Sequence, residues 1–206
     1  MDLAFYAAMT WRYIQAMLPG AILALALFFL LRPFRMRRLA GRGLSSPLRR
    51  EAVLLLLYLF SGGMAALTLL PSDWVNPLVN LIYGVPLGPF FSLGSVNLNL
   101  FATLELGHQT RFTIFILLGN IIMFIPFGFF AALLWRGFTW KRVLVLGLCV
   151  TAFIECWQLC IDRAFDIDDL LFNALGVLCG YWLWWLLERA APAFAGRFQV
   201  QEKSVT

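Results

Sequence analysis

The chain has 206 residues, of which 62% are hydrophobic and only 13% are charged. A soluble domain carries about 25% charged residues, so this composition excludes a water-soluble protein, and its apolar content also excludes a disordered chain. The net charge of +5 suggests an anionic partner, and its meaning depends on where the basic residues lie. A secreted disulfide scaffold is excluded because the four cysteines lie in apolar runs without framework spacing: Cys149, Cys156, Cys160 and Cys179.

Five segments are long and apolar enough to cross a bilayer, which takes about 20 residues of helix. They are residues 14–31, 52–70, 112–134, 143–161 and 170–187. Hydrocarbon offers the backbone no hydrogen-bond partners, so each span must be helical. The first is expected to be a retained span rather than a cleaved signal, because its basic residues follow the apolar run. We therefore predict an all-α bundle of five transmembrane helices that forms one domain over residues 1–206.

The basic residues predict the orientation of this bundle. Segments 32–50 and 135–142 and the C-terminal tail hold 13 of the 16 Lys and Arg residues, and the opposite side holds the other three. Basic loops favour the cytoplasm, so the N-terminus is expected outside and the C-terminus inside. The positive charge is then a topology signal that faces anionic lipid head groups, and no nucleic-acid partner is expected.

The longest connection, residues 71–111, falls on the predicted outer side. Loops longer than about 15 residues are usually functional or disordered, and this one is too apolar for disorder. We expect it to lie in the membrane interface or to fold back onto the bundle, with a short strand near residues 96–104.

Polar residues form a stripe on the fourth span. Glu155 is the only charged residue well inside any span, where a charge costs about 2.5–3.5 kcal/mol and normally faces the bundle interior. Thr151, Gln158 and Asp162 lie four residues before it and three and seven after it. These offsets place all four on one helical face.

The third and fifth spans carry matching residues. The members of the fifth-span stripe step by three or four residues: Asp166, Asp169, Asn173, Gly176 and Gly180. Its glycines are expected to let a neighbouring helix approach closely. The third span contributes Asn120 to the polar set, and Pro126 and Gly128 to helix packing.

The depths of three polar residues predict that they meet. At 1.5 Å per residue, Asn120, Glu155 and Asn173 lie about 12, 9 and 5 Å below the outer ends of their spans. Arg163, in the turn above them, could pair with Glu155, with Asp166 or with an anionic ligand.

Two interpretations of this polar set stay open: hydrogen bonds that only join helices, or a site for a head group. Under the second interpretation Glu155 and Asp169 are the candidate catalytic acids. The candidate ligand-binding residues are Asn120, Glu155, Gln158, Arg163, Asp166, Asp169 and Asn173.

The sequence predicts no metal and no cofactor. His108 is the only histidine, which excludes His-rich metal sites and lipid phosphatases that need two histidines. The four aspartates of residues 162–169 could bind a divalent cation, but an anionic helix start explains them equally well. There is no Walker A, GxSxG or HExxH motif.

The polar stripes also carry a family resemblance. Residues 119–129, GNIIMFIPFGF, resemble the N-x-x-x-F-x-P-x-G core of the VanZ-like family. Residues 155–158, 163–169 and 173–180 are similar to its E-x-x-Q, R-x-x-D-x-x-D and N-x-x-G-x-x-x-G signature. The resemblance covers about residues 97–185. It departs at residues 97–101, which keep the Asn, Leu and Phe of the family's N-L-I-P-F segment but lack the Pro.

The resemblance implies a bacterial inner-membrane protein whose family namesake is linked to teicoplanin resistance without an established reaction. Three functions follow as hypotheses. The first is a non-enzymatic protein that binds a lipid-linked cell-wall precursor or another amphiphilic ligand at the outer leaflet. The second is an enzyme acting on a lipid or precursor head group. The third is a lipid transporter or flippase, which the absence of an evident inverted repeat disfavours.

Overall fold

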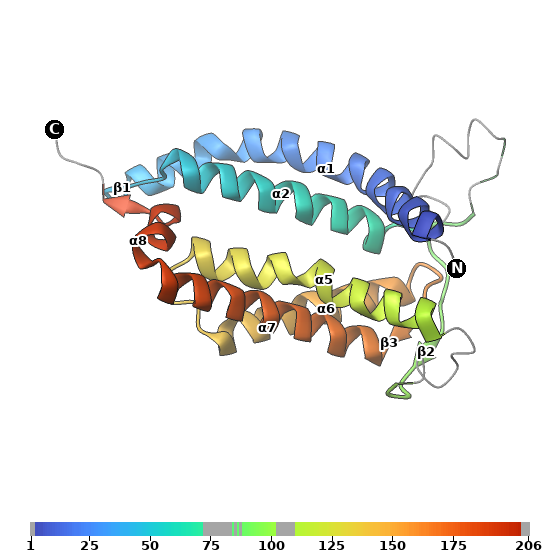
Figure 1. Cartoon of the computed structure of the whole chain (residues 1–206). Coiled ribbons are helices and arrows are strands. Elements are labelled where there is room, and N and C mark those ends of the chain that lie inside the picture. Colours follow the sequence, from blue (N-terminus) through green and yellow to red (C-terminus); the bar gives the residue numbers. More distant parts are fainter. Residues whose placement is uncertain (1–2, 72–83, 85, 87, 102–109, 203–206) are drawn as a thin grey trace.

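The computed structural model describes residues 3–71, 84, 86, 88–101 and 110–202. Five of its helices are long and apolar enough to cross a membrane, so the predicted five-helix bundle is confirmed. They are α1 (Leu3–Ala40), α2 (Leu48–Leu69), α5 (Thr110–Leu134), α6 (Trp140–Leu159) and α7 (Ile167–Ala190). In Figure 1 the α1–α2 hairpin forms one layer, and α5, α6 and α7 form the other.

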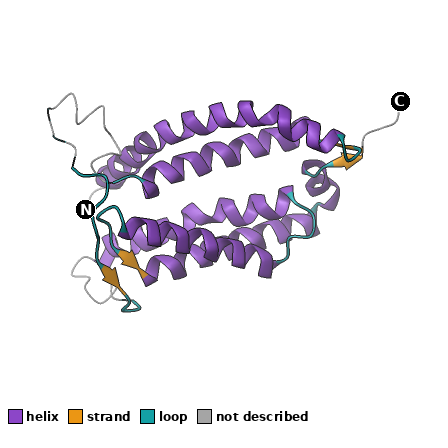
Figure 2. Ribbon diagram, turned by 180° about the vertical axis from the view of Figure 1, so that it is seen from behind, coloured by secondary structure: helices purple, strands orange, loops and turns teal. Residues whose placement is uncertain are grey.

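Two short strand pairs lie at opposite ends of the bundle (Figure 2). At one end β2 (Val96–Asn97) pairs in parallel with β3 (Phe165–Asp166). At the other end β1 (Leu44–Ser45) pairs antiparallel with β4 (Gln201–Glu202), which follows α8 (Pro192–Ala195) and η2 (Gly196–Phe198). We call these the β2/β3 end, where α1 begins, and the β1/β4 end.

Helix α1 differs most from the prediction, because it begins at Leu3 instead of near residue 14 and extends into the basic segment 32–50. This segment was expected to be a loop, but α1 continues through it to Ala40 and α2 begins at Leu48. Arginine is a good helix former, and Arg37 and Arg38 in the last turn complement the negative end of the helix dipole. The bounds of α5, α6 and α7 agree with the predicted spans to within three residues.

Glycines set the close approach of α5 and α7, the most extensively packed pair of helices. A Cβ at Gly128 would collide with the backbone of Val177 on α7. A Cβ at Gly180 would collide with the backbone of Ile125 on α5, and Gly176 meets α5 in the same way. Small residues therefore bring the two backbones into contact, as membrane helices commonly do.

Glycines also bring α1 and α2 close together, which the sequence analysis did not predict. The backbones of Gly20 and Gly62 approach so closely that neither position has room for a Cβ. Most of the contacts of α1 are with α2. Its other faces expose large apolar side chains, which suits a helix surrounded by lipid: Ile22, Leu23, Phe29, Leu30 and Phe34.

Candidate functional site

The start of α7 gathers carboxylates because of how this helix is capped. Asp166 is the N-cap residue, and its Oδ1 accepts a hydrogen bond of 2.9 Å from the backbone N–H of Asp168. Asp168 and Asp169 occupy the first turn, where the helix dipole favours negative charge. The sequence Asp-Ile-Asp-Asp is therefore a local helix start that also concentrates negative charge at the β2/β3 end.

The side chain of Glu155 on α6 contacts the start of α7. This side chain is almost fully buried, with 1% exposure, and Oε2 accepts the backbone N–H of Asp166 at 3.0 Å. The backbone amides at a helix N-terminus stabilise such a carboxylate. Glu155, Asp166, Asp168 and Asp169 together form what we call the acidic cluster.

Two amide side chains join α7 to its neighbouring helices. Asn120 Nδ2 on α5 donates a short hydrogen bond to Asp169 Oδ1. One turn further along α7, Asn173 Nδ2 donates to Thr151 Oγ1 on α6 at 2.8 Å, and both residues are buried. The structure thus brings Asn120 and Glu155 to the first turns of α7, where Asn173 also lies. Each of the three residues has a different hydrogen-bond partner.

Gln158 and Arg163 contact α2 rather than the cluster. Gln158 Nε2 donates to the carbonyl of Thr68 at 3.3 Å, and Arg163 Nη1 donates to the carbonyl of Leu67 at 2.6 Å. The last carbonyls of a helix lack intrahelical partners, so these bonds cap α2. The sequence identified the face on which these residues lie but not the helix that they contact.

Arg163 remains electrostatically coupled to the cluster. Among the described residues it forms no ion pair with Glu155 or Asp166, although the sequence suggested one. Burial lowers the pKa of the Arg163 guanidinium, and the nearby carboxylates of Glu155 and Asp169 oppose that shift. The positive charge therefore lies beside the acidic cluster without neutralising a particular carboxylate.

The described part of the segment before α5 folds back onto this end, as expected. Ser92 accepts the N–H of Asp162 at 2.7 Å through its carbonyl and donates its own N–H to the carbonyl of Cys160 at 3.0 Å. Gly94 lies against the backbone of Arg163, where a Cβ would not fit. The expected strand near residues 96–104 is β2, at residues 96–97; much of segment 71–111 lies outside the described residues.

This segment also contributes hydrogen-bond donors to the acidic cluster, which the sequence did not predict. Asn97 Nδ2 donates to Asp166 Oδ2 at 3.1 Å, and the backbone N–H of Phe101 donates to Asp168 Oδ1 at 2.7 Å. Phe101 adopts a positive φ of 64°. The acidic cluster is therefore covered on one side by residues 92–101, which fix the positions of two of its carboxylates.

Two buried oxygens at the site have no hydrogen-bond partner within the described part of the chain, namely Asp168 Oδ2 and Asn173 Oδ1. Nearly all buried polar atoms in proteins find a partner, so each of these has a free acceptor position. The described residues contain no group of three metal-ligating side chains arranged to hold an ion. The carboxylates therefore extend along the α6–α7 seam instead of surrounding one point.

An apolar cavity of about 180 Å³ lies between α2, α5, α6 and α7. Val177 lines it one turn beyond Asn173, and Gly147 lines it one turn before Thr151. The Thr151–Asn173 hydrogen bond therefore lies between the acidic cluster and the cavity. The remaining lining residues are Leu57, Ser61, Phe124, Phe127, Ala131, Trp135, Val143, Leu146 and Val150.

Comparison with known proteins identifies the family of this chain. The family model described as VanZ/LLP1 matches residues 52–188, which is more than half of the chain and runs from α2 into α7. No curated protein and no solved structure matches the chain. The matched region contains the acidic cluster, the capped end of α2 and the glycine contacts of α5 with α7. The resemblance seen in the sequence is thus confirmed, and the chain belongs to the VanZ/LLP1 family, as a protein with five membrane-spanning helices.

Proposed function

We propose that this protein binds a lipid-linked or amphiphilic envelope ligand, such as a cell-wall precursor, at the β2/β3 end of the bundle. The observation that supports the proposal is the position of the acidic cluster about two helical turns from an apolar cavity, with the Thr151–Asn173 hydrogen bond between them. A polar group next to an apolar space suits a molecule that has both a head group and a chain. The orientation predicted from the basic residues would put this end on the outer side of the membrane, which the resemblance implies is the bacterial inner membrane.

The chemistry of the cluster favours a head group rich in hydrogen-bond donors. A buried acceptor without a partner costs about 1–3 kcal/mol, and Asp168 Oδ2 and Asn173 Oδ1 are two such acceptors in the described part of the chain. Hydroxyl, amide or ammonium groups would satisfy them. A bare anion would be repelled by four nearby carboxyl groups. Sugars, peptides and amino groups are therefore the expected head-group components.

Ligand binding at this position would affect envelope chemistry on the outer side. Precursors and glycopeptide drugs meet there, so the amount of accessible ligand would change susceptibility to a glycopeptide such as teicoplanin. This part of the proposal rests on the resemblance to the family, whose namesake is linked to teicoplanin resistance.

An enzyme acting on the head group is the second candidate. The observation that favours it is the fixed geometry of Glu155, a buried carboxylate held by one backbone N–H at 3.0 Å. A carboxylate positioned in this way can act as general acid or base, as can Asp169 beside Asn120.

The substitution Glu155→Gln tests binding because it keeps the shape of the side chain and removes its charge. Loss of a hydrogen bond to a charged group, worth about 1.5–3 kcal/mol, predicts affinity about 10- to 100-fold weaker. Native mass spectrometry of the purified protein would measure the co-purified envelope lipid, and cells expressing each variant would be tested with teicoplanin. Thermal unfolding in detergent checks that the variant is folded.

Asp162→Asn is the matched control. Asp162 is exposed at the same end and has a φ of 59°, a conformation that Asn tolerates, so this amide should leave binding unchanged. A folded Glu155→Gln variant with unchanged lipid retention and unchanged susceptibility would contradict the proposal. Conversion of an added lipid extract that stops in both Glu155→Gln and Asp169→Asn would identify the enzyme instead.

A variant that fills the cavity tests whether the chain of the ligand binds there while its head group binds at the acidic cluster. Ser61 lines the cavity from α2, and Ser61→Leu adds apolar volume there without touching the acidic cluster. The variant is expected to lose ligands with a long chain and to keep short-chain analogues with the same head group. Equal retention of both would mean that the cavity is not part of the site.

A further inference from the structure

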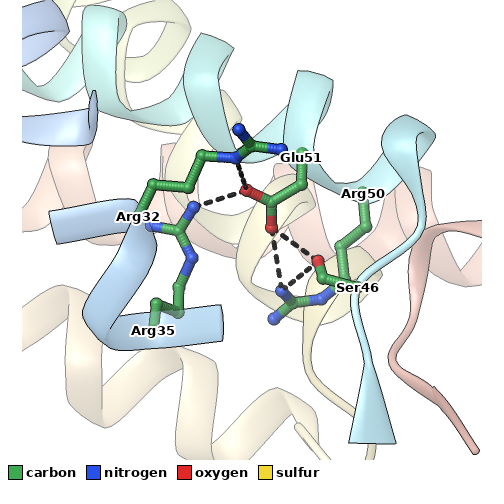
Figure 3. Close-up of polar contacts among 5 residues, drawn as sticks. All are labelled: Arg32, Arg35, Ser46, Arg50 and Glu51. Atoms are coloured by element: carbon green, nitrogen blue, oxygen red, sulfur yellow. Dashed lines mark hydrogen bonds and ion pairs between the residues drawn. The ribbon is translucent and has the colours of Figure 1, made fainter. Parts of the chain in front are cut away.

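A second polar cluster lies at the β1/β4 end, around a buried carboxylate (Figure 3). Glu51 Oε2 accepts from Arg35 Nη2 at 2.6 Å and lies 3.4 Å from Arg32 Nε. Its Oε1 accepts from Ser46 Oγ at 2.5 Å and lies 4.0 Å from Arg50 Nη1. We call these five residues the Arg–Glu cluster. They come from α1, from the turn after β1 and from the first turn of α2.

The Arg–Glu cluster carries more positive charge than its carboxylate can balance. Three guanidinium groups share one carboxylate, which leaves a net charge of +2. Segment 32–50 contains no acidic residue, and Glu202 on the neighbouring strand β4 is exposed. An arginine cannot release its proton in a protein, so this charge is permanent.

Several of the arginine N–H groups have no acceptor. In the described part of the chain, Arg35 Nε and Nη1 and Arg50 Nε are buried and lack a hydrogen-bond partner. Arg50 as a whole is only 4% exposed, whereas the Arg32 side chain is 47% exposed and leaves an approach from outside. Buried charges are normally paired, so these N–H groups suit an anion that offers several acceptor oxygens.

Aromatic and basic side chains gather at the same end of the bundle as the Arg–Glu cluster. Trp135 and Trp140, at the end of α5 and the start of α6, belong to the same end of the bundle. The Arg189 guanidinium lies 3.8 Å from the centre of the Trp185 ring in the last turns of α7. Aromatic and basic residues together mark the boundary between hydrocarbon and water.

We propose that Arg35 and Arg50, assisted by Arg32, bind a phosphate group at the β1/β4 end of the bundle. Guanidinium groups match phosphate oxygens in pairs, which would use the unpartnered N–H groups. Glu51 competes with the phosphate for the guanidinium groups and lowers the net charge that the phosphate meets. The phosphate belongs to an anionic phospholipid or to a free phosphate ester. This site is independent of the acidic cluster at the opposite end.

The test is a lipid titration of the full-length protein, followed by native mass spectrometry. Phosphatidylglycerol is compared with a glucosyl-diacylglycerol that has the same acyl chains and no phosphate. Loss of one charged hydrogen-bond donor predicts phosphatidylglycerol binding at least about tenfold weaker in Arg35→Gln and in Arg50→Gln. Arg49→Gln, at an exposed neighbouring position with the same change of charge, should bind like wild type.

Glu51→Gln gives a result that a damaged fold cannot imitate. It removes the carboxylate that competes for the arginines, so a folded variant should bind phosphatidylglycerol more tightly. If Arg50→Gln does not fold, Arg35→Gln decides, since the Arg35 side chain is partly exposed. Inorganic phosphate that displaces the lipid would support a free phosphate ester as the ligand, and lipid binding that resists it would support a head group.

Three results would overturn the proposal. The first is equal binding of the phosphate-free glycolipid. The second is a loss in Arg49→Gln as large as in Arg35→Gln, which would indicate only a general attraction to the basic surface. The third is unchanged or weaker binding in a folded Glu51→Gln variant.

Discussion

Gly180→Ala is expected to destabilise the bundle by separating α5 from α7. The added Cβ would lie 2.8 Å from the backbone N of Phe129 and 3.0 Å from the carbonyl carbon of Ile125, and closer still to the oxygen of that carbonyl. All of these are backbone atoms of α5, so no side-chain rotation can relieve the contact. The two helices must move apart along the most extensive interface of the protein.

The size of the effect follows from two opposing contributions. Overpacking a helix interface costs about 1–3 kcal/mol, and replacing Gly by Ala inside a helix recovers about 0.5–1 kcal/mol. The net loss for Gly180→Ala is therefore at most about 2.5 kcal/mol. Gly119→Ala isolates the steric part, because a Cβ at Gly119 on α5 meets nothing within 4 Å and the helix gains the same propensity. The two variants should differ by about 1–3 kcal/mol.

The assay is unfolding in mixed micelles with increasing SDS, followed by circular dichroism. Wild type, Gly119→Ala and Gly180→Ala are measured under the same conditions. Gly180→Ala should unfold first, and Gly119→Ala should match or exceed wild type. Equal stability of the two alanine variants would refute the close contact of α5 with α7 at this position.

The remaining predictions concern single contacts and the orientation of the chain. A double-mutant cycle of Thr151→Val and Asn173→Leu should give a coupling energy of about 0.6 kcal/mol, and at most about 1.7, as for other hydrogen bonds between membrane helices; zero coupling would mean that the 2.8 Å bond contributes nothing. Gly94→Val should push residues 92–97 away from Arg163 and speed hydrogen exchange of the backbone amide at position 94, which in the wild type donates to the carbonyl of Leu159 at 2.8 Å; exchange as slow as in the wild type would argue against that close approach. A fluorescent protein fused to the C-terminus should fluoresce in bacteria, and alkaline phosphatase fused there should be inactive; the reverse pattern would invert the predicted orientation.

The helices could be predicted from the sequence because apolar length is a local property. The bounds of α1 failed at both ends: the helix begins at Leu3 rather than near residue 14, and arginine side chains in segment 32–50 end the hydrophobic run without ending the helix. The strand pairs could not be predicted. Both β1 and β4 are two residues long, and their pairing joins parts of the chain that are 156 residues apart.

The sequence predicted which helical faces carry the candidate site residues, but it did not predict which residues they contact. A spacing of three and four residues placed Glu155 and Gln158 on one face, but whether a side chain contacts α2 or α7 depends on the tertiary arrangement. Glu51 was missed because it lies between the basic segment 32–50 and the predicted span 52–70, outside the polar stripes that defined the candidate site. The sequence feature that could have identified Glu51 is a single acidic residue directly after Arg49 and Arg50. The cavity depends on how side chains from four helices fill space, which no local pattern reports.

The packing of α1 has a consequence for how the protein is made. Because α1 contacts mainly α2, the hairpin can enter the membrane and complete most of its contacts before α5 has been translated. The last three helices depend on one another, because α7 supplies most of the contacts of both α5 and α6. Assembly should therefore occur in two steps, with α2 as the surface on which the second half docks. Two separately expressed halves, divided between α2 and α5, should reassemble in the membrane.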